Sequence, residues 1–271
     1  RILGEYRRGG KVKEMAGVFS SILLSFFIGI LLAAIQIIPF LEYLKLSWSL
    51  AARSRLATNP YFLPPKAIVA FLVPNFFGNP VANNFWGTGQ NMNYSEITGY
   101  LGILPLLLAI VALVFEIKDR RVIFFLLLSS FSLAMVYRVF PIFQLVTRFP
   151  GFSISANSRL LLMSTFSISI LAGRGADFLV NRSSQKQRRL IPLLLGIFSG
   201  LALLVIILFT QNNIALGYLR EPWTRYVWQN ILLFIFLAIS GVLLLTLWSR
   251  GRMNVKIFQL LAIGLIVLDL F

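Results

Sequence analysis

Apolar residues fill long stretches of the chain, polar connections separate these stretches, and charged residues are almost absent from the middle of each one. A helix needs about 20 apolar residues to cross a bilayer, and only a helix can cross as a single segment. We therefore predict an all-α fold: a polytopic transmembrane helical bundle with about seven spans, forming a single domain. The predicted spans cover residues 15–39, 97–115, 122–137, 159–180, 190–209, 230–248 and 257–271.

The region 40–96 breaks this pattern and is predicted to lie on the outer face of the membrane. Residues 67–73 are apolar but lie between Pro65 and Pro74, and so short a run cannot cross a bilayer. We expect a re-entrant segment that enters the membrane surface and returns. Residues 40–59 place apolar side chains three to four positions apart, which is typical of an amphipathic helix on the interface. A solvated helix of an outer domain is the alternative.

Positive charge is unevenly distributed along the chain. There are 25 Lys and Arg against 9 Asp and Glu, a formal net charge of +16. The basic residues are concentrated in short connections and form no continuous face, which argues against nucleic acid as a partner. Cytoplasmic connections of membrane proteins are enriched in Lys and Arg, so these segments, and with them the start of the chain, are predicted to be cytoplasmic. The four basic segments are residues 1–14, 116–121, 181–189 and 249–256.

Composition excludes several kinds of chemistry. The chain has no Cys and no His, which rules out thiolate or imidazole metal sites, Cys nucleophiles and His-based triads. No metal site and no cofactor is predicted, although a divalent cation stays open. Residues 173–175 read Gly-Arg-Gly but lack the Lys-Ser/Thr ending of a phosphate loop, so no nucleotide site is indicated. Because the sequence begins at Arg1 and stops inside an apolar stretch, we expect it to be part of a longer protein.

The residues with candidate chemistry are mostly in or near the outer region. Glu96 precedes Tyr100 by four positions, so one helix would project both from the same face. The alternative for Glu96 is that it offsets the dipole of a helix start. Asn75, Trp86 and Tyr94 form the mixture of amides and aromatic faces that binds sugars. A structural anchor is an equally good explanation of Trp86.

Two arginines are candidates for binding a lipid phosphate. Arg148 and Arg159 are at predicted outer membrane edges, where a guanidinium can bind a phosphate through two hydrogen bonds. The alternative is that both side chains extend toward the head groups. Near the inner end of a predicted span, Gly173 and Gly175 are expected to let helices pack closely. Asp177 is expected to pair with Arg174 three residues earlier.

An ordered set of motifs runs from residue 63 to residue 177, within a similarity to known proteins that covers roughly residues 30–180. It comprises Leu63-Pro64-Pro65, residues 71–78 (Phe-Leu-Val-Pro-Asn-Phe-Phe-Gly), Phe85-Trp86-Gly87, residues 100–109 (Tyr-Leu-Gly-Ile-Leu-Pro-Leu-Leu-Leu-Ala), Phe149-Pro150-Gly151-Phe152, Arg159, and residues 171–177 (Leu-Ala-Gly-Arg-Gly-Ala-Asp). Together these motifs resemble the YfhO family of bacterial multi-pass membrane proteins. That family is similar to C-type glycosyltransferases, which take a sugar from a polyprenyl-phosphate carrier at the outer face of the membrane. The resemblance implies a location in the bacterial inner membrane and an acceptor among cell-surface glycopolymers such as lipoteichoic acid.

The resemblance also implies what this chain does not supply. In such enzymes the catalytic carboxylate is usually in the first outer loop, near the N-terminus of the complete protein, and this chain does not contain a matching loop. We therefore assign no catalytic residue and expect a substrate-binding part of a glycosyltransferase. Its predicted partners are a polyprenyl-phosphate-linked sugar, a glycopolymer acceptor and the lipid bilayer. The predicted substrate-binding residues are Glu96, Asn75, Trp86, Tyr94, Tyr100, Arg148 and Arg159. A lipid or glycolipid flippase and a non-catalytic membrane scaffold are the alternatives.

Overall fold

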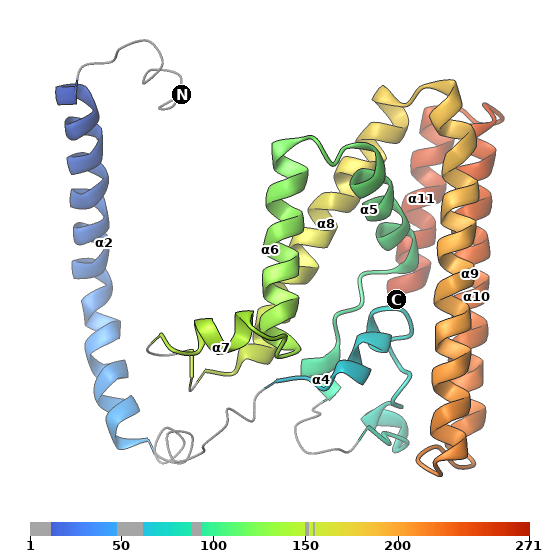
Figure 1. Ribbon diagram of the computed structural model, residues 1–271, viewed down its shortest axis with the longest axis horizontal. Coiled ribbons are helices and arrows are strands. Elements are labelled where there is room, and N and C mark those ends of the chain that lie inside the picture. The colour runs from blue at the N-terminus through green and yellow to red at the C-terminus, as the bar shows by residue number, and fades with distance from the viewer. Residues whose placement is uncertain (1–11, 48–61, 88–93, 150–151, 154) are drawn as a thin grey trace. The chain divides into compact units, whose positions relative to one another are not determined.

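The computed structural model describes residues 12–47, 62–87, 94–149, 152–153 and 155–271. All the regular structure in these residues is helical, which confirms the predicted all-α class. The chain divides into two compact units, residues 1–58 and residues 59–271. Each unit is described by itself, and the elements carry the labels of Figure 1.

The first unit contains one long helix, α2 (Val12–Leu46). Residues 17–46 form a candidate membrane span with a mean hydropathy of 2.6. The predicted span over residues 15–39 is therefore helical, but the predicted end at Pro39 is wrong because Pro39 lies inside α2. Proline removes one backbone donor, and membrane helices tolerate this loss. Residues 40–46 of the predicted interfacial helix continue α2, while residues 48–59 lie outside the described residues.

The second unit is built around a long helical hairpin. Helix α9 (Gln185–Ala215) begins with a capping box, in which Ser184 and Gln187 satisfy each other's backbone N–H groups. Helix α10 (Trp223–Ser249) returns beside it, and α11 (Val255–Leu270) packs against α10 (Figure 1). With 31 and 27 residues, α9 and α10 are long and apolar enough to cross a membrane.

The remaining predicted spans correspond to shorter helices. These are α5 (Ile103–Phe115), α6 (Arg120–Val136), α8 (Leu161–Asp177) and α11, with 13, 17, 17 and 16 residues. In the described residues, three helices meet the length and composition of a span, so the structure does not support the predicted count of seven. The predicted span over residues 97–115 is broken because Gly102 adopts φ +92° and residues 98–102 are not helical.

Helix α8 packs against both α5 and α6, and it approaches α5 closely because it presents a small residue there. A Cβ atom on Gly175 would lie 1.8 Å from the backbone oxygen of Leu108, so only glycine allows this approach. The expected packing role of Gly175 is confirmed. Gly173 differs, because a Cβ atom there would meet nothing within 4 Å.

Short helices lie at one end of the second unit, among them η1 (Pro65–Phe71), α4 (Tyr94–Ile97), α7 (Ile142–Val146) and η3 (Asn157–Leu160) (Figure 1). The segment predicted to be re-entrant is the 3-10 helix η1, which is too short to cross a bilayer, as expected. Its N-terminal side is attached to α6, because the backbone N–H of Leu63 donates to Val136 O at 2.9 Å. Its C-terminal side leads to Phe76, whose ring lies 5.4 Å from that of Phe209 in α9.

The three basic connections of this unit meet at its other end. The α5–α6 and α8–α9 connections are joined by ion pairs, including Arg182 with Glu116 at 2.6 Å. Near the start of α9, Arg188 lies over the ring of Trp248 at the end of α10, so the α8–α9 and α10–α11 connections are close together. When successive long helices alternate in direction, every second connection lies at the same end. The common location of these three connections therefore agrees with alternating helix directions within residues 103–271.

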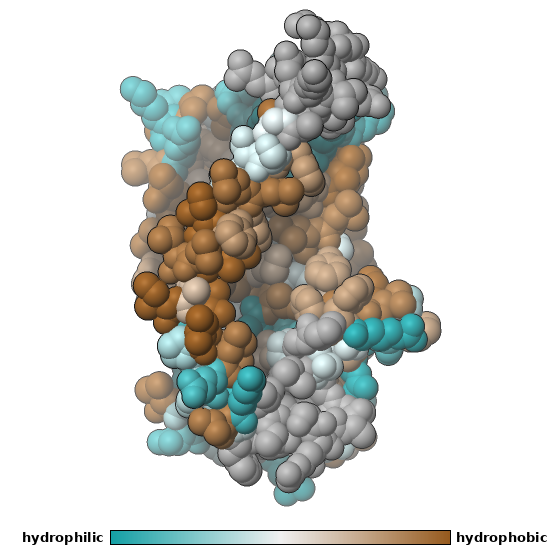
Figure 2. All heavy atoms as spheres, turned by 90° about the vertical axis from the view of Figure 1, so that its left-hand side faces the viewer, coloured by the Kyte–Doolittle hydropathy of each residue, from teal (hydrophilic) through white to brown (hydrophobic). Residues whose placement is uncertain are grey.

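Large hydrophobic side chains cover much of the surface. Much of the coloured surface in Figure 2 is hydrophobic. Over the described residues as a whole, exposed apolar side chains include Leu32 of α2, Leu193 of α9 and Leu260 of α11, at 74%, 61% and 72% exposure. Water-soluble proteins rarely expose apolar patches larger than a few hundred Å². Together with the three long apolar helices, this surface is that of a membrane protein.

Candidate functional site

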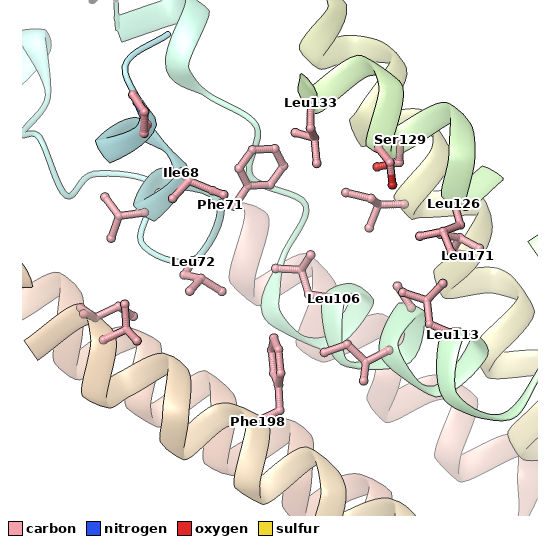
Figure 3. Close-up of a pocket in the computed structure, with 18 of the residues that line it drawn as sticks. Ile68, Phe71, Leu72, Leu106, Leu113, Leu126, Ser129, Leu133, Leu171 and Phe198 are labelled. Carbon is pink, nitrogen blue, oxygen red and sulfur yellow. The ribbon is translucent and has the colours of Figure 1, made fainter. Parts of the chain in front are cut away.

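An apolar cavity of about 600 Å³ lies between η1, α5, α6, α8 and α9. Figure 3 shows side chains from all of these elements facing one another across it. An apolar cavity of about 150 Å³ is large enough to hold benzene. This cavity is about four times as large, so it has room for a hydrocarbon chain with several times the volume of benzene. Its lining includes Ile68, Phe71, Leu72, Leu106, Leu113, Leu126, Leu133, Leu171 and Phe198.

The cavity extends along α9 from Phe198 to Phe209. Eleven residues of α-helix rise about 17 Å, which is close to half of the roughly 30 Å hydrocarbon thickness of a bilayer. Lys66 is the charged residue of the lining, and its side chain is exposed where η1 begins. The cavity thus combines an apolar interior with one ammonium group at its edge.

Glu96 and Arg159 are brought together by the short elements next to the cavity. Glu96 lies in the single-turn helix α4 (Tyr94–Ile97), and Arg159 lies in η3 (Asn157–Leu160). Arg159 Nε is 3.9 Å from Glu96 Oε1, and the hydroxyl of Ser158 donates to Glu96 Oε2 at 3.0 Å. The Arg159 side chain is 77% exposed and that of Glu96 is 26% exposed, so both can still contact a ligand.

The η3 segment is attached directly to a wall of the cavity. The hydroxyl of Ser132 in α6 donates to the carbonyl oxygen of Leu160 in η3. Leu133, the next residue of α6, lines the cavity. The group formed by Glu96, Ser158 and Arg159, which we call the outer polar cluster, is therefore held beside the α6 wall.

Asn75 and Tyr94 are also brought together. The hydroxyl of Tyr94 donates to Asn75 Oδ1 at 2.9 Å, and the Tyr94 ring meets Phe85 edge to face with centroids 6.0 Å apart. Burial, and then the neighbouring Tyr226, raise the pKa of the Tyr94 phenol. The phenol therefore keeps its proton at neutral pH and remains a hydrogen-bond donor.

Trp86 is packed into the loop that contains it. Its indole N–H donates to Phe76 O at 3.0 Å, and its ring centroid lies 5.1 Å from that of Phe77. The backbone N–H of Trp86 donates to Phe77 O at 2.8 Å. These contacts close the loop between residues 76 and 86, as a structural anchor would. Stacking of Trp86 on a sugar stays a prediction.

The spacing predicts that Tyr100 and Glu96 project from one face of a helix, but the structure does not place them on one helix. Helix α4 ends at Ile97, so the two residues do not belong to one helix. The Tyr100 hydroxyl donates to Asp269 Oδ1 in α11, and Asp269 Oδ2 accepts from the backbone N–H of Ile103 at 2.7 Å. Burial, followed by the hydrogen bond to Asp269, raises the pKa of Tyr100.

Arg148 is exposed in the turn after α7 (Ile142–Val146) and pairs with no described carboxylate. Arg138, an arginine for which the sequence gave no prediction, lies over the rings of Phe62 and Phe143, with its guanidinium carbon 5.1 and 5.4 Å from the ring centres.

Ser158 is a residue of the site that the sequence analysis did not predict. Its position next to Arg159 in the sequence was the one local signal that could have indicated it.

No group of three or more acidic residues that could hold a metal ion is found in the described part of the chain. Comparison with protein-family models, with curated proteins and with solved structures gave no match.

Proposed function

We propose that this chain forms the substrate-binding part of a membrane glycosyltransferase of the C type, related to the YfhO family. It would transfer a sugar from a polyprenyl-phosphate carrier to a cell-surface glycopolymer of the lipoteichoic-acid type. The observation that carries the proposal is the apolar cavity, which has Lys66 at its edge and the outer polar cluster fixed to its α6 wall.

The cavity and the cluster suit the two parts of a lipid-linked sugar. A polyprenyl chain is hydrocarbon and would occupy the apolar interior, because contact with the apolar lining would remove its surface from water. Its phosphate would lie at the edge beside the Lys66 ammonium, and the exposed Arg159 guanidinium of the outer polar cluster is a second candidate partner, because both groups bind phosphate oxygens. Glu96 would accept a hydrogen bond from a sugar or acceptor hydroxyl. The catalytic carboxylate is expected from a part of the protein outside this chain.

The orientation follows from the basic end of the second unit. We assign this end to the cytoplasm of a bacterium and the end with η1, α4 and η3 to the outer face of its inner membrane. We also propose that the start of the chain is cytoplasmic, because residues 1–14 are rich in Lys and Arg. The orientation of the second unit is supported by the common location of the α5–α6, α8–α9 and α10–α11 connections.

The first experiment tests lipid binding to the cavity. The full-length protein is purified into lipid nanodiscs and titrated with a radiolabelled long-chain polyprenyl phosphate. Leu133→Trp fills the cavity and is expected to weaken binding at least tenfold. Leu127→Trp is the matched control, because Leu127 is on the same helix, is 63% exposed and does not line the cavity. Equal binding by both variants would remove the cavity from the proposal.

The second experiment tests sugar transfer. Cells that depend on the full-length protein are supplied with Glu96→Gln or Ser158→Ala, and the sugar content of the surface polymer is measured. Both variants are expected to lower it, with normal amounts of folded protein. Wild-type sugar content in both would exclude the outer polar cluster from transfer. Retained lipid binding without any transfer by the wild-type protein would favour the flippase alternative, because the same cavity would suit a transported lipid.

A further inference from the structure

The basic end of the second unit contains two kinds of positive charge. Arg174 and Arg182 belong to a closed ion-pair network with three acids. Arg174 Nη2 lies 2.5 Å from Asp119, Arg182 Nη1 lies 2.6 Å from Glu116, and Arg182 Nη2 lies 2.5 Å from Asp177. This network uses the three described carboxylates of the α5–α6 and α8–α9 connections.

Lys118, Arg120 and Arg121 near the α5–α6 connection pair with no described carboxylate, and a second group of six basic residues at the ends of α9, α10 and α11 also has no such partners. We call this group the cationic patch; none of its members pairs with a carboxylate among the described residues. Five of the six side chains are exposed and Arg188 is half-buried. The members are Lys186, Arg188 and Arg189 of α9, Arg250 and Arg252 of the α10–α11 connection, and Lys256 of α11.

Aromatic contacts hold the three helix ends of the patch together. The Arg188 guanidinium lies 5.5 Å from the centre of the Trp248 ring in α10. Trp248 in turn stacks on Phe258 of α11, with centroids 4.8 Å apart and planes 25° apart. Arg188 Nε also donates to Ser183 Oγ at 2.8 Å, which fixes the guanidinium in this position. The six charges therefore gather around one packed centre.

An exposed apolar belt begins directly beside the patch. Leu190 and Leu193 follow Arg189 on α9, and Ile257 and Leu260 follow Lys256 on α11, with 43% to 72% of each side chain exposed. Exposed apolar surface of this kind marks contact with the hydrocarbon of a bilayer in a membrane protein. The cationic patch is then at the depth of the lipid head groups, where phosphates are the available anions.

We propose that the cationic patch binds the head groups of anionic phospholipids in the leaflet at this end of the protein. Unpaired charge, its concentration on three helix ends and its position at the edge of the apolar belt all favour this partner. Basic pockets between transmembrane helices bind anionic head groups in the same way, and each Lys or Arg near an anionic surface strengthens binding about fivefold. The proposal is independent of sugar transfer.

The test compares two pairs of arginines at opposite ends of α10. The full-length protein, purified in detergent, is titrated with phosphatidylglycerol or phosphatidylcholine, and bound lipids are counted by native mass spectrometry. Arg250→Ala with Arg252→Ala is expected to weaken phosphatidylglycerol binding at least fivefold. Arg220→Ala with Arg225→Ala removes the same charge at the other end and is expected to leave binding unchanged.

Two further measurements make the outcome decisive. Arg250→Lys with Arg252→Lys keeps the charge and is expected to bind as the wild type does, which separates charge from damage to the fold. Binding should weaken in 0.5 M salt, because exposed charges are screened. Equal losses in the two alanine pairs, or equal binding of the two lipids by the wild type, would overturn the proposal.

Discussion

Arg182 and Glu116, which are 66 residues apart in the sequence, form an ion pair that joins two helices. Arg182 ends η4 (Phe178–Arg182), a π-helical continuation of α8, and Glu116 directly follows α5. Arg182 Nη1 lies 2.6 Å from Glu116 Oε1, and Arg174 Nη2 lies 3.3 Å from Glu116 Oε2. Glu116 is thus the buried centre of the network, with a side chain that is 7% exposed.

Glu116→Ala is expected to destabilise the protein by about 2 kcal/mol, the usual worth of a hydrogen bond to a charged group. The substitution removes a buried carboxylate that accepts from Arg182 and pairs with Arg174, although both arginines keep Asp177 and Asp119 as partners. An exposed pair contributes less, about 0–1 kcal/mol. Asp177→Ala is the matched control, because Asp177 is 36% exposed and its partner Arg182 is 45% exposed. The measurement is thermal unfolding in detergent, and a loss for Asp177→Ala as large as that for Glu116→Ala would contradict the central role of Glu116.

Gly175→Ala is expected to destabilise the contact between α5 and α8. The added methyl group would overlap Leu108 O, and overpacking of this kind typically costs about 1–3 kcal/mol. Gly173→Ala, two residues earlier, meets open space and should be neutral or stabilising by up to about 1 kcal/mol, because alanine favours helices. Unfolding of both variants in the same detergent distinguishes them, and similar behaviour would mean that the helices do not approach at Gly175.

The helical class and the long hairpin could be predicted because they depend on local hydropathy. The predicted spans 190–209 and 230–248 lie inside α9 and α10, and both helices extend beyond them into polar residues. The break before α5 was harder to see, because it depends on backbone packing. At Gly99 a Cβ atom would lie 2.7 Å from the Phe71 ring, so the chain here is shaped by a contact with η1. Hydropathy also could not tell that Pro39 is inside α2.

The candidate site was predictable where chemistry is concentrated in the sequence and unpredictable where it depends on distant contacts. Asn75 and Tyr94 were expected in one site and are hydrogen-bonded. The pairing of Tyr100 with Asp269 spans 169 residues and has no local signal. The cavity is formed by five separate elements, and no single stretch of sequence indicates it.

Tyr100→Phe is expected to remove part of the pH dependence of stability at high pH. Burial and Asp269 raise the pKa of Tyr100 in the folded protein, while the unfolded chain titrates near 10. The folded state then holds more protons than the unfolded state above about pH 10, so this contribution is present below that pH and decreases as pH rises. Unfolding temperatures between pH 8 and 11 should fall more steeply for the wild type than for Tyr100→Phe. Parallel curves would show that the Tyr100 phenol titrates normally.

Substitutions of Trp86 can distinguish its packing role from sugar binding. Trp86→Phe keeps an aromatic ring but loses the hydrogen bond to Phe76 O, which should cost about 1 kcal/mol. Trp86→Ala also removes the contacts with Phe76 and Phe77 and should cost about 3 kcal/mol, toward the lower end of large aromatic truncations because Trp86 is half-buried. Thermal unfolding in detergent measures both losses. If packing is the role of Trp86, sugar transfer per folded molecule should be unchanged in Trp86→Phe. A stable Trp86→Ala variant that has lost transfer would instead assign the indole ring to the substrate.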